Sequence, residues 1–212
     1  MTPGARRALD AAARLFYARG IHAVGVDLIA AEAGVTKKTL YDRFGSKEQI
    51  VVEYLAERDE RWRAFLDTYL AEAGPARDRI LAVFDASRDW ARDRMAKGCG
   101  MVNAHAEISD PDHPAYPLII GQKAWMLALF TGLAREAVLA REVVPYEAGA
   151  DASDARATAA PDPERLGRTL MLLHEGALVA HGLHVFPDAV GRACEEADAL
   201  LLAAGVRGSA GI

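Results

Sequence analysis

Apolar residues recur at helical spacing along most of this chain of 212 residues. The clearest stretch predicts one short helix from apolar residues spaced three and four apart: Val26, Ile29, Ala30 and Ala33. Gly34 follows, and glycine readily adopts the left-handed conformation that ends a helix. Thr36 can then cap a second short helix, in which Leu40 and Phe44 form the apolar side. The pattern predicts two helices packed against each other across a tight turn.

The same periodicity predicts seven further helices, which together with this pair give an all-α chain of about nine helices. The further helices are expected at about 3–19, 46–73, 76–97, 101–108, 115–143, 163–185 and 187–204. Residues 146–163 lack large apolar side chains and are rich in Ala, Asp, Gly and Pro, which indicates a mobile surface linker. Residues 206–212 are expected to fray.

The polar side of the helix after Thr36 is basic and rich in hydroxyl groups. Such a helix, apolar behind and basic in front, is what a helix that reads the major groove of DNA requires. The candidate DNA-binding residues are Thr36, Lys37, Lys38, Thr39, Tyr41, Arg43 and Lys47. Within this set, we expect Tyr41 and Lys47 to hold phosphates. The base edges would be read by Lys37, Lys38 and Thr39.

The stretch from Leu9 to Ile50 resembles the DNA-binding domain of TetR/AcrR-type transcriptional regulators. The resemblance is carried by residues that fall in register without gaps: Ala12, Leu15, Phe16, Arg19, Gly20, Ile29, Ala30, Ala33, Gly34, Val35, Thr39, Leu40, Tyr41, Phe44, Ser46, Lys47 and Glu48. Three positions depart from the usual pattern, namely Gly25, Leu28 and Lys38. The first two remove groups that could touch phosphate, whereas Lys38 adds a basic contact particular to this chain.

The resemblance implies two domains and a dimeric one-component regulator. Residues 3–63 would form the helix-turn-helix DNA-binding domain, with the motif at 25–44, and residues 64–212 would bind an effector and dimerise. A repressor that binds a palindromic operator and is released by a small organic ligand is the function implied. The homodimer would form through 162–204, where two apolar stripes lie at helical spacing: Leu166, Leu170, Leu173, Ala177 and Ala180/His181, and Val190, Cys194, Ala197, Leu201 and Ala204. An ordinary core within one chain is the alternative for these stripes.

The distribution of charge changes the picture that the net charge gives. The whole chain carries −5, which alone argues against a nucleic-acid partner. Residues 1–47, however, hold eight basic and four acidic residues, a balance of +4, so the remainder carries −9. A basic head and an acidic body are consistent with DNA binding by the head.

The effector site is predicted in the C-terminal body, among aromatic and aliphatic side chains with a few polar ones. The candidates are Phe84, Arg88, Trp90, Asn103, Glu107, Trp125, Leu129 and His174. This mixture suits an amphipathic organic molecule. For Asn103 and Glu107 the alternative is a structural role, in which they bind backbone groups near the Gly98-Cys99-Gly100 break.

Other chemistries find weaker support in the sequence. His174, His181 and His184 share a spacing that invites a metal site, but Glu175 directly follows His174 and is expected to point away. Cys99 leaves a redox-sensing regulator of the same fold as a second alternative. An all-helical enzyme is the opposing class; no catalytic pattern supports it, and neither enzyme activity nor a cofactor is expected. The longest apolar stretch, residues 124–134, is too short to span a membrane, so a cytoplasmic protein is expected.

Overall fold

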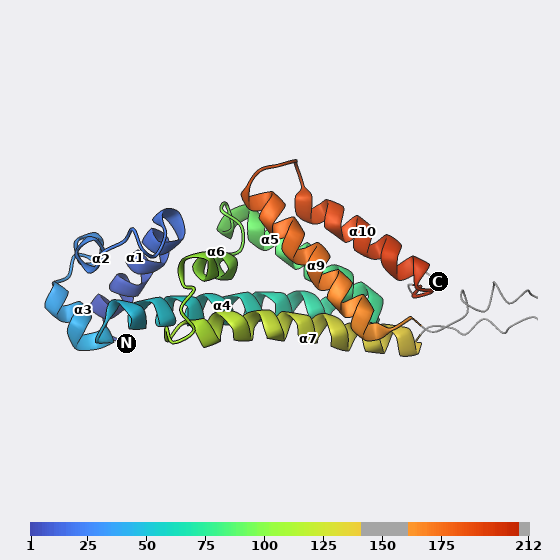
Figure 1. Ribbon diagram of the computed structural model, residues 1–212, viewed down its shortest axis with the longest axis horizontal. Coiled ribbons are helices and arrows are strands. Elements are labelled where there is room, and N and C mark those ends of the chain that lie inside the picture. Colours follow the sequence, from blue (N-terminus) through green and yellow to red (C-terminus); the bar gives the residue numbers. More distant parts are fainter. Residues whose placement is uncertain (141–160, 208–212) are drawn as a thin grey trace, which may run out of the picture. The chain divides into compact units, whose positions relative to one another are not determined.

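The computed structural model describes residues 1–140 and 161–207 (Figure 1). Within these ranges every regular element is a helix, which confirms the predicted all-α class. The chain divides into two compact units, one of Met1–Phe65 with Asp93–Ala124 and one of Leu66–Arg92 with Trp125–Ile212. Residues 93–124 therefore pack with the first unit, although they follow the predicted boundary at residue 63. The functional division into a DNA-binding and an effector domain stays a prediction.

The first unit is built from four whole helices and parts of longer ones. It contains α1 (Pro3–Arg19), α2 (Val26–Ala33), α3 (Lys37–Phe44), the start of α4 (Lys47–Glu72), α6 (Gly100–Glu107) and the start of α7 (Tyr116–Ala140). The helices α1, α2 and α3 contact one another in pairs. Their shared core is fully buried, and it includes the predicted apolar residues Ile29, Leu40 and Phe44.

The end of α1 is held by a turn that lies about eighty residues away in the sequence. Gly20 has φ +92, a left-handed conformation that glycine adopts at little cost. Beyond it, the backbone N–H groups of Ile21 and His22 donate to the two carboxylate oxygens of Glu107, at 2.9 and 2.8 Å. The hydroxyl of Tyr17 donates to the carbonyl oxygen of Gly98 at 2.9 Å. These bonds give partners to backbone groups that lie outside the helices.

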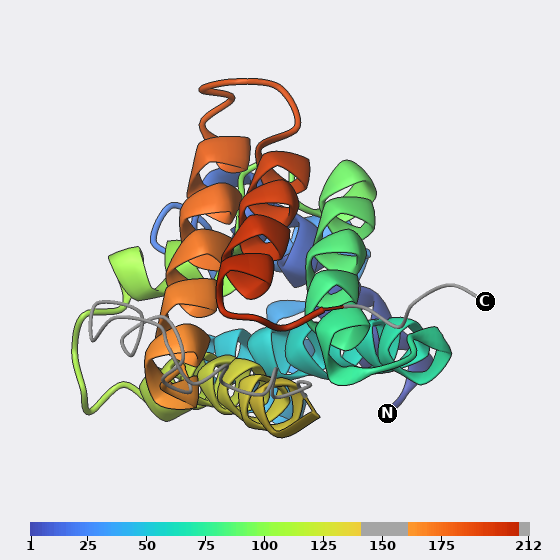
Figure 2. The same ribbon diagram turned by 90° about the vertical axis from the view of Figure 1, so that its right-hand side faces the viewer.

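The second unit contains α5 (Ala76–Arg94), α9 (Pro163–Gly182) and α10 (Ala189–Ala203), with parts of α4 and α7. Helices α9 and α10 run side by side in opposite directions, as both views show (Figure 2). The unit's core gathers Phe84 and Phe130, whose ring centroids lie 5.7 Å apart. Arg77 of α5 is paired with Asp198 of α10, which ties these helices together by a half-buried ion pair.

The predicted dimer stripes face the inside of their own chain. In α9 and α10 the stripe residues Leu166, Leu170, Ala177, Val190, Ala197 and Leu201 are buried, while Leu173, Ala180, His181, Cys194 and Ala204 are half-buried. For the six buried residues the predicted surface between two chains is therefore wrong, and the alternative of an intrachain core is confirmed. Periodicity identified the apolar side correctly, but it does not distinguish burial within a chain from burial between chains.

Two predicted segments lie wholly or mostly outside the described residues. These are the linker 146–163, of which only 161–163 is described, and the tail 206–212, of which only 206–207 is described. Helix α7 has 25 residues, so the apolar stretch 124–134 is part of one longer helix, as predicted for residues 115–143. By length and composition α7 could cross a membrane, but a core helix of a globular protein passes the same test, so no membrane is assigned.

Gly20→Ala is expected to destabilise the protein, because a Cβ at φ +92 is strained and would lie 3.1 Å from both carboxylate oxygens of Glu107. We expect the free energy of unfolding, measured by urea titration, to fall by about 1–2 kcal/mol. Gly4→Ala is the matched control in the same helix, since its Cβ would make only an ordinary contact with Val35 at 3.5 Å. That change should be stabilising by about 0.5–1 kcal/mol, and equal effects of the two changes would contradict the role of Gly20.

Candidate nucleic-acid interface and effector cavity

Helices α2 and α3 are joined as the sequence predicts. Gly34 adopts φ +61 and ψ 42, and its backbone N–H closes the last turn of α2. The hydroxyl of Thr36 accepts from the backbone N–H of Thr39 at 3.2 Å, so Thr36 caps α3. Gly25 begins α2 without a side-chain cap, and Leu28 packs partly against the core. The cap and the turn fix the direction of α3 relative to α2.

Most of the predicted DNA-binding residues share one exposed surface along α3. Leu40 and Phe44 are buried beneath it, with relative exposures of 1% and 5%. The exposed residues are Thr36, Lys37, Lys38, Tyr41 and Arg43, with Thr39 half-exposed among them. Tyr41 is half exposed although it is large and partly apolar. The structure therefore brings these six residues together.

The cations of this surface are held in ion pairs that solvent reaches. Lys37 Nζ lies 2.5 Å from Asp27, and Lys38 Nζ lies 2.6 Å from Asp42. Arg43 forms two parallel hydrogen bonds with Glu53, at 3.0 and 3.1 Å. Exposed pairs of this kind contribute about 0–1 kcal/mol, so phosphate groups can replace the carboxylates at little cost.

Lys47 occupies a different setting from the other basic residues. It is half-buried at the start of α4, where it lines a cavity of about 400 Å³. His22, Glu107 and His113 line the same cavity. Its neighbour Glu48 has a lowered pKa, because hydrogen bonds from its own backbone N–H and from Ser46 stabilise the carboxylate. The backbone N–H of Gln49 donates to the hydroxyl of Ser46 at 3.1 Å, so Ser46 caps this helix.

The structure places the predicted effector residues in both units and in different settings. Phe84 and His174 lie in the closed core of the second unit, where their rings are 5.8 Å apart and both are almost fully buried. Trp90 is also buried, and Trp125 and Leu129 are half-buried on α7. Arg88 lines a cavity of this unit together with residues of α9 and α10.

His174 is held by a buried hydrogen-bond network. The hydroxyl of Ser87 donates its single proton to the carbonyl of Val83 at 2.8 Å, so it accepts from Nε2 of His174, also at 2.8 Å. Contrary to the prediction, Glu175 does not point away from His174, since its carboxylate lies 3.4 Å from Nδ1 of the ring. Both ring nitrogens thus have partners inside the protein, which favours a structural role for His174.

Asn103 and Glu107 belong to the first unit, apart from the other predicted effector residues. The side-chain amide of Asn103 donates to the carbonyl of Lys97 at 2.8 Å, beside the Gly98 turn. Glu107 binds the backbone at the end of α1, as described above. These are the contacts of the structural alternative, in which both residues satisfy backbone groups.

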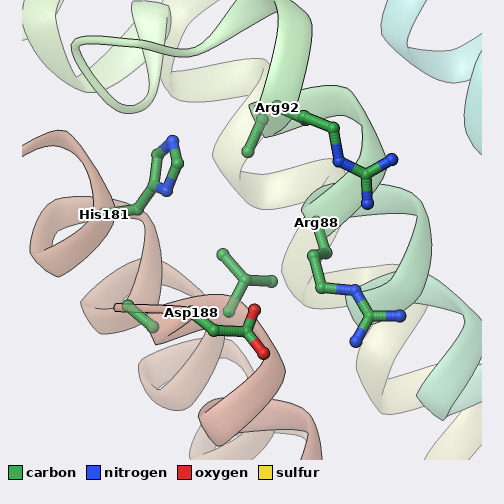
Figure 3. Close-up of a pocket in the computed structure, with 7 residues that line it drawn as sticks. Arg88, Arg92, His181 and Asp188 are labelled. Carbon is green, nitrogen blue, oxygen red and sulfur yellow. The ribbon is translucent and has the colours of Figure 1, made fainter. Parts of the chain in front are cut away.

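A cavity of about 440 Å³ opens between α5, the end of α9 and the start of α10 (Figure 3). Its lining combines charged and small apolar residues: Arg88, Ala91, Arg92, His181, Asp188, Ala189 and Val190. Arg88 is among the residues predicted from the sequence, whereas Arg92 and Asp188 are not. Arginines that alternate with aspartates, as on α5, are typical of a solvated helix face. The spacing of the two arginines by one helical turn was the available signal.

The metal and redox alternatives receive different support. Among the described residues, no group of three potential metal ligands comes together. Cys99 is the N-cap of α6, and Lys123 Nζ lies 3.2 Å from its sulfur, a basic neighbour of the kind that reactive cysteines have. Burial raises the pKa of Cys194 to about 11, so Cys194 is a neutral thiol at physiological pH.

Comparison with known proteins points to transcriptional regulators. Residues 8–54 match the family described as bacterial regulatory proteins, tetR family. The chain is 28% identical over 131 residues to the HTH-type transcriptional activator FasR of Mycolicibacterium smegmatis, a match that covers 62% of this chain and 59% of FasR. The chain thus spans about three-fifths of the length of that relative.

Two solved structures extend the similarity over nearly the whole chain. SCO4454, a TetR-family transcriptional regulator from Streptomyces coelicolor, is 29% identical, with a TM-score of 0.74 over 92% of this chain and 96% of its own. A TetR-type regulator from Streptomyces avermitilis is 27% identical, with a TM-score of 0.67 over 93% of this chain and 99% of its own. The fold is that of the TetR regulators.

The raised pKa of Cys194 gives a pH-dependent reactivity. In a Cys99→Ser variant we expect iodoacetamide to modify Cys194 slowly at pH 8, because roughly one thiol in a thousand is then ionised, and faster by about tenfold for each pH unit towards 11. Mass spectrometry would follow the reaction. In guanidinium the pKa returns towards 9.0 and the same cysteine should react much faster. Equal rates in the native and denatured protein would contradict the burial of this thiol.

Proposed function

The chain is a transcriptional regulator of the TetR family, and on this premise we propose that it acts as a cytoplasmic homodimer that represses transcription from a palindromic operator and is released by a small organic ligand. The observation that carries DNA binding is the basic surface of α3, since it combines a buried apolar back with exposed Lys37, Lys38 and Tyr41. Two copies of α3 in a dimer would read two half-sites.

An exposed apolar stripe on α9 supports the proposed dimer. Leu172, Val179 and Leu183 have relative exposures of 74%, 46% and 70%. Together with Gly176 they are spaced four, three and four residues apart, so they share one face of the helix. A Cβ at Gly176 would meet nothing within 4 Å, which leaves room for a second helix to approach closely. This face, rather than the buried stripes, is the proposed surface between two copies of the chain.

The proposed response to a ligand rests on linkage. A ligand that binds the DNA-free form more tightly weakens operator affinity by the same factor, about 1.4 kcal/mol for each tenfold loss. It must also raise the melting temperature of the free protein. FasR is named an activator. Measuring transcription from the bound promoter would show whether this chain activates or represses, and we expect repression.

For DNA recognition, we expect Lys38→Ala and Lys47→Ala to act differently in fluorescence anisotropy with DNA from upstream of the protein's own gene. Lys38→Ala should cost about 1–3 kcal/mol on the operator and relax the preference at one base pair, because an exposed Lys38 is placed to meet a base edge. Lys47→Ala should weaken binding to operator and random DNA alike and reduce the salt slope by about 1.

The control for both variants is Arg135→Ala, which removes an exposed cation from the second unit, on α7 and outside the proposed dimer stripe, and should leave DNA affinity unchanged. Melting temperatures would show that each variant is folded. If Lys38→Ala lowered the affinity for operator and for random DNA equally, the base-reading role of Lys38 would be wrong. If the wild type bound none of the DNA beside its own gene at low salt, the proposed function would fail.

For the dimer, Leu172→Asp is expected to produce a folded monomer, because burying an unpaired carboxylate between two helices costs about 3–5 kcal/mol. Sedimentation velocity would compare it with the wild type, for which we expect a dimer of 22.8 kDa chains. Leu139→Asp is the matched control, since Leu139 is 85% exposed on α7 outside the stripe. A monomeric wild type, or dissociation by both changes alike, would contradict the proposed surface.

A further inference from the structure

The cavity between α5 and the α9–α10 turn has a divided lining. Arg88 and Arg92 lie one turn apart on α5, and His181 projects from the other side, at the end of α9 (Figure 3). Ala91, Ala189 and Val190 add apolar surface to the same lining. A polar wall and an apolar wall around about 440 Å³ are the features of a site for a small amphipathic molecule.

Both arginines are held by partners that are easily replaced. Arg88 lies 3.1 Å from Asp85, and Arg92 lies 2.9 Å from Asp89, each within one turn of the same helix. The arginine side chains are 43% and 69% exposed, so water screens these pairs and they stabilise the fold little. A ligand carboxylate can therefore take up the guanidinium groups, whose planar fork matches its two oxygens.

His181 adds an independent sign of a polar ligand. Its Nε2 is buried and has no hydrogen-bond partner among the described residues. A buried polar atom without a partner is unfavourable, and a polar group of a bound molecule would relieve the cost. The ring of His184, 6.3 Å away from that of His181, packs beside it but supplies no hydrogen bond to Nε2.

The acidic residues around the cavity limit the charge that it can accept. Asp188 is the N-cap of α10 in a left-handed conformation, φ 51, and its Oδ1 accepts from the backbone N–H of Gly191 at 3.3 Å. With Asp85 and Asp89 it sets three carboxylates against the two arginines, so repulsion rises with each negative charge that a ligand carries. A monoanion suits this balance better than a phosphate dianion.

We propose that this cavity binds a small organic monocarboxylate. Its carboxylate accepts hydrogen bonds from Arg88 and Arg92, and its apolar part lies on Ala91, Ala189 and Val190. A polar atom of the ligand meets Nε2 of His181. The binding step stands on the cavity alone, whereas any effect of the ligand on transcription rests on the proposed regulator function.

The test uses three probes of nearly the same planar shape: benzoate, benzamide and benzamidine, which are negative, neutral and positive. Isothermal titration of the full-length protein at matched salt should give binding of benzoate, at least tenfold weaker binding of benzamide, and none of benzamidine. Arg88→Gln/Arg92→Gln should weaken benzoate binding at least tenfold. Arg135→Gln, the same change at an exposed arginine outside the cavity, should leave it unchanged.

Equal affinities for benzoate and benzamide, or unchanged benzoate binding by the double variant, would overturn the proposal. Because both arginines are substantially exposed, the double variant is expected to fold, and its melting temperature without ligand checks this. Operator binding is measured on the same preparations. Benzoate binding without DNA binding would refute the regulator function but support this site. DNA binding without benzoate binding would support the regulator function and refute this site.

Discussion

The burial of Leu40 and Phe44 is the constraint on which the DNA-reading surface depends. Helix α3 has eight residues, and isolated helices shorter than about 12–15 residues are marginal in water. It persists because these two side chains are removed from water against the core shared with α1 and α2. Thr36 fixes where the helix begins, and Arg7 of α1 donates to the carbonyl of Ala33 at 3.1 Å, at the end of α2. The polar front of α3 is positioned by its apolar back.

This arrangement explains why the head could be predicted from sequence in such detail. The turn at Gly34, the cap at Thr36 and the buried pair Leu40 and Phe44 are all local features, within a few residues of the elements that they control. The clamp of Glu107 on Ile21 and His22 could not be predicted in this way, because it joins residues 85 and 86 positions apart. A carboxylate on a short helix looks the same in sequence whether it meets a ligand or a backbone N–H.

Helices α9 and α10 show a second limit to what the sequence can predict. This limit does not come from distance along the chain. Helix α9 has two apolar faces, one with Leu166 and Leu170 and one with Leu172 and Val179. Burial removes apolar surface from water equally well within a chain or between chains. Sequence periodicity therefore found the stronger stripe and assigned it to the dimer, while the structure places that stripe inside and leaves the weaker one exposed.

Solvent exposure distinguishes the cations that can bind a ligand from those that stabilise the fold. Arg77 is paired with Asp198 and only 17% of its side chain is exposed, so losing its partner would leave a largely buried charge uncompensated. Lys38 on α3 and Arg92 on α5 are 82% and 69% exposed, and each is paired within one turn of its own helix. Water stabilises both partners when they separate, so an incoming anion competes with the carboxylate for the cation on nearly equal terms. The degree of exposure, which periodicity does not give, thus makes the α3 surface and the α5 cavity available for binding and keeps the α5–α10 pair structural.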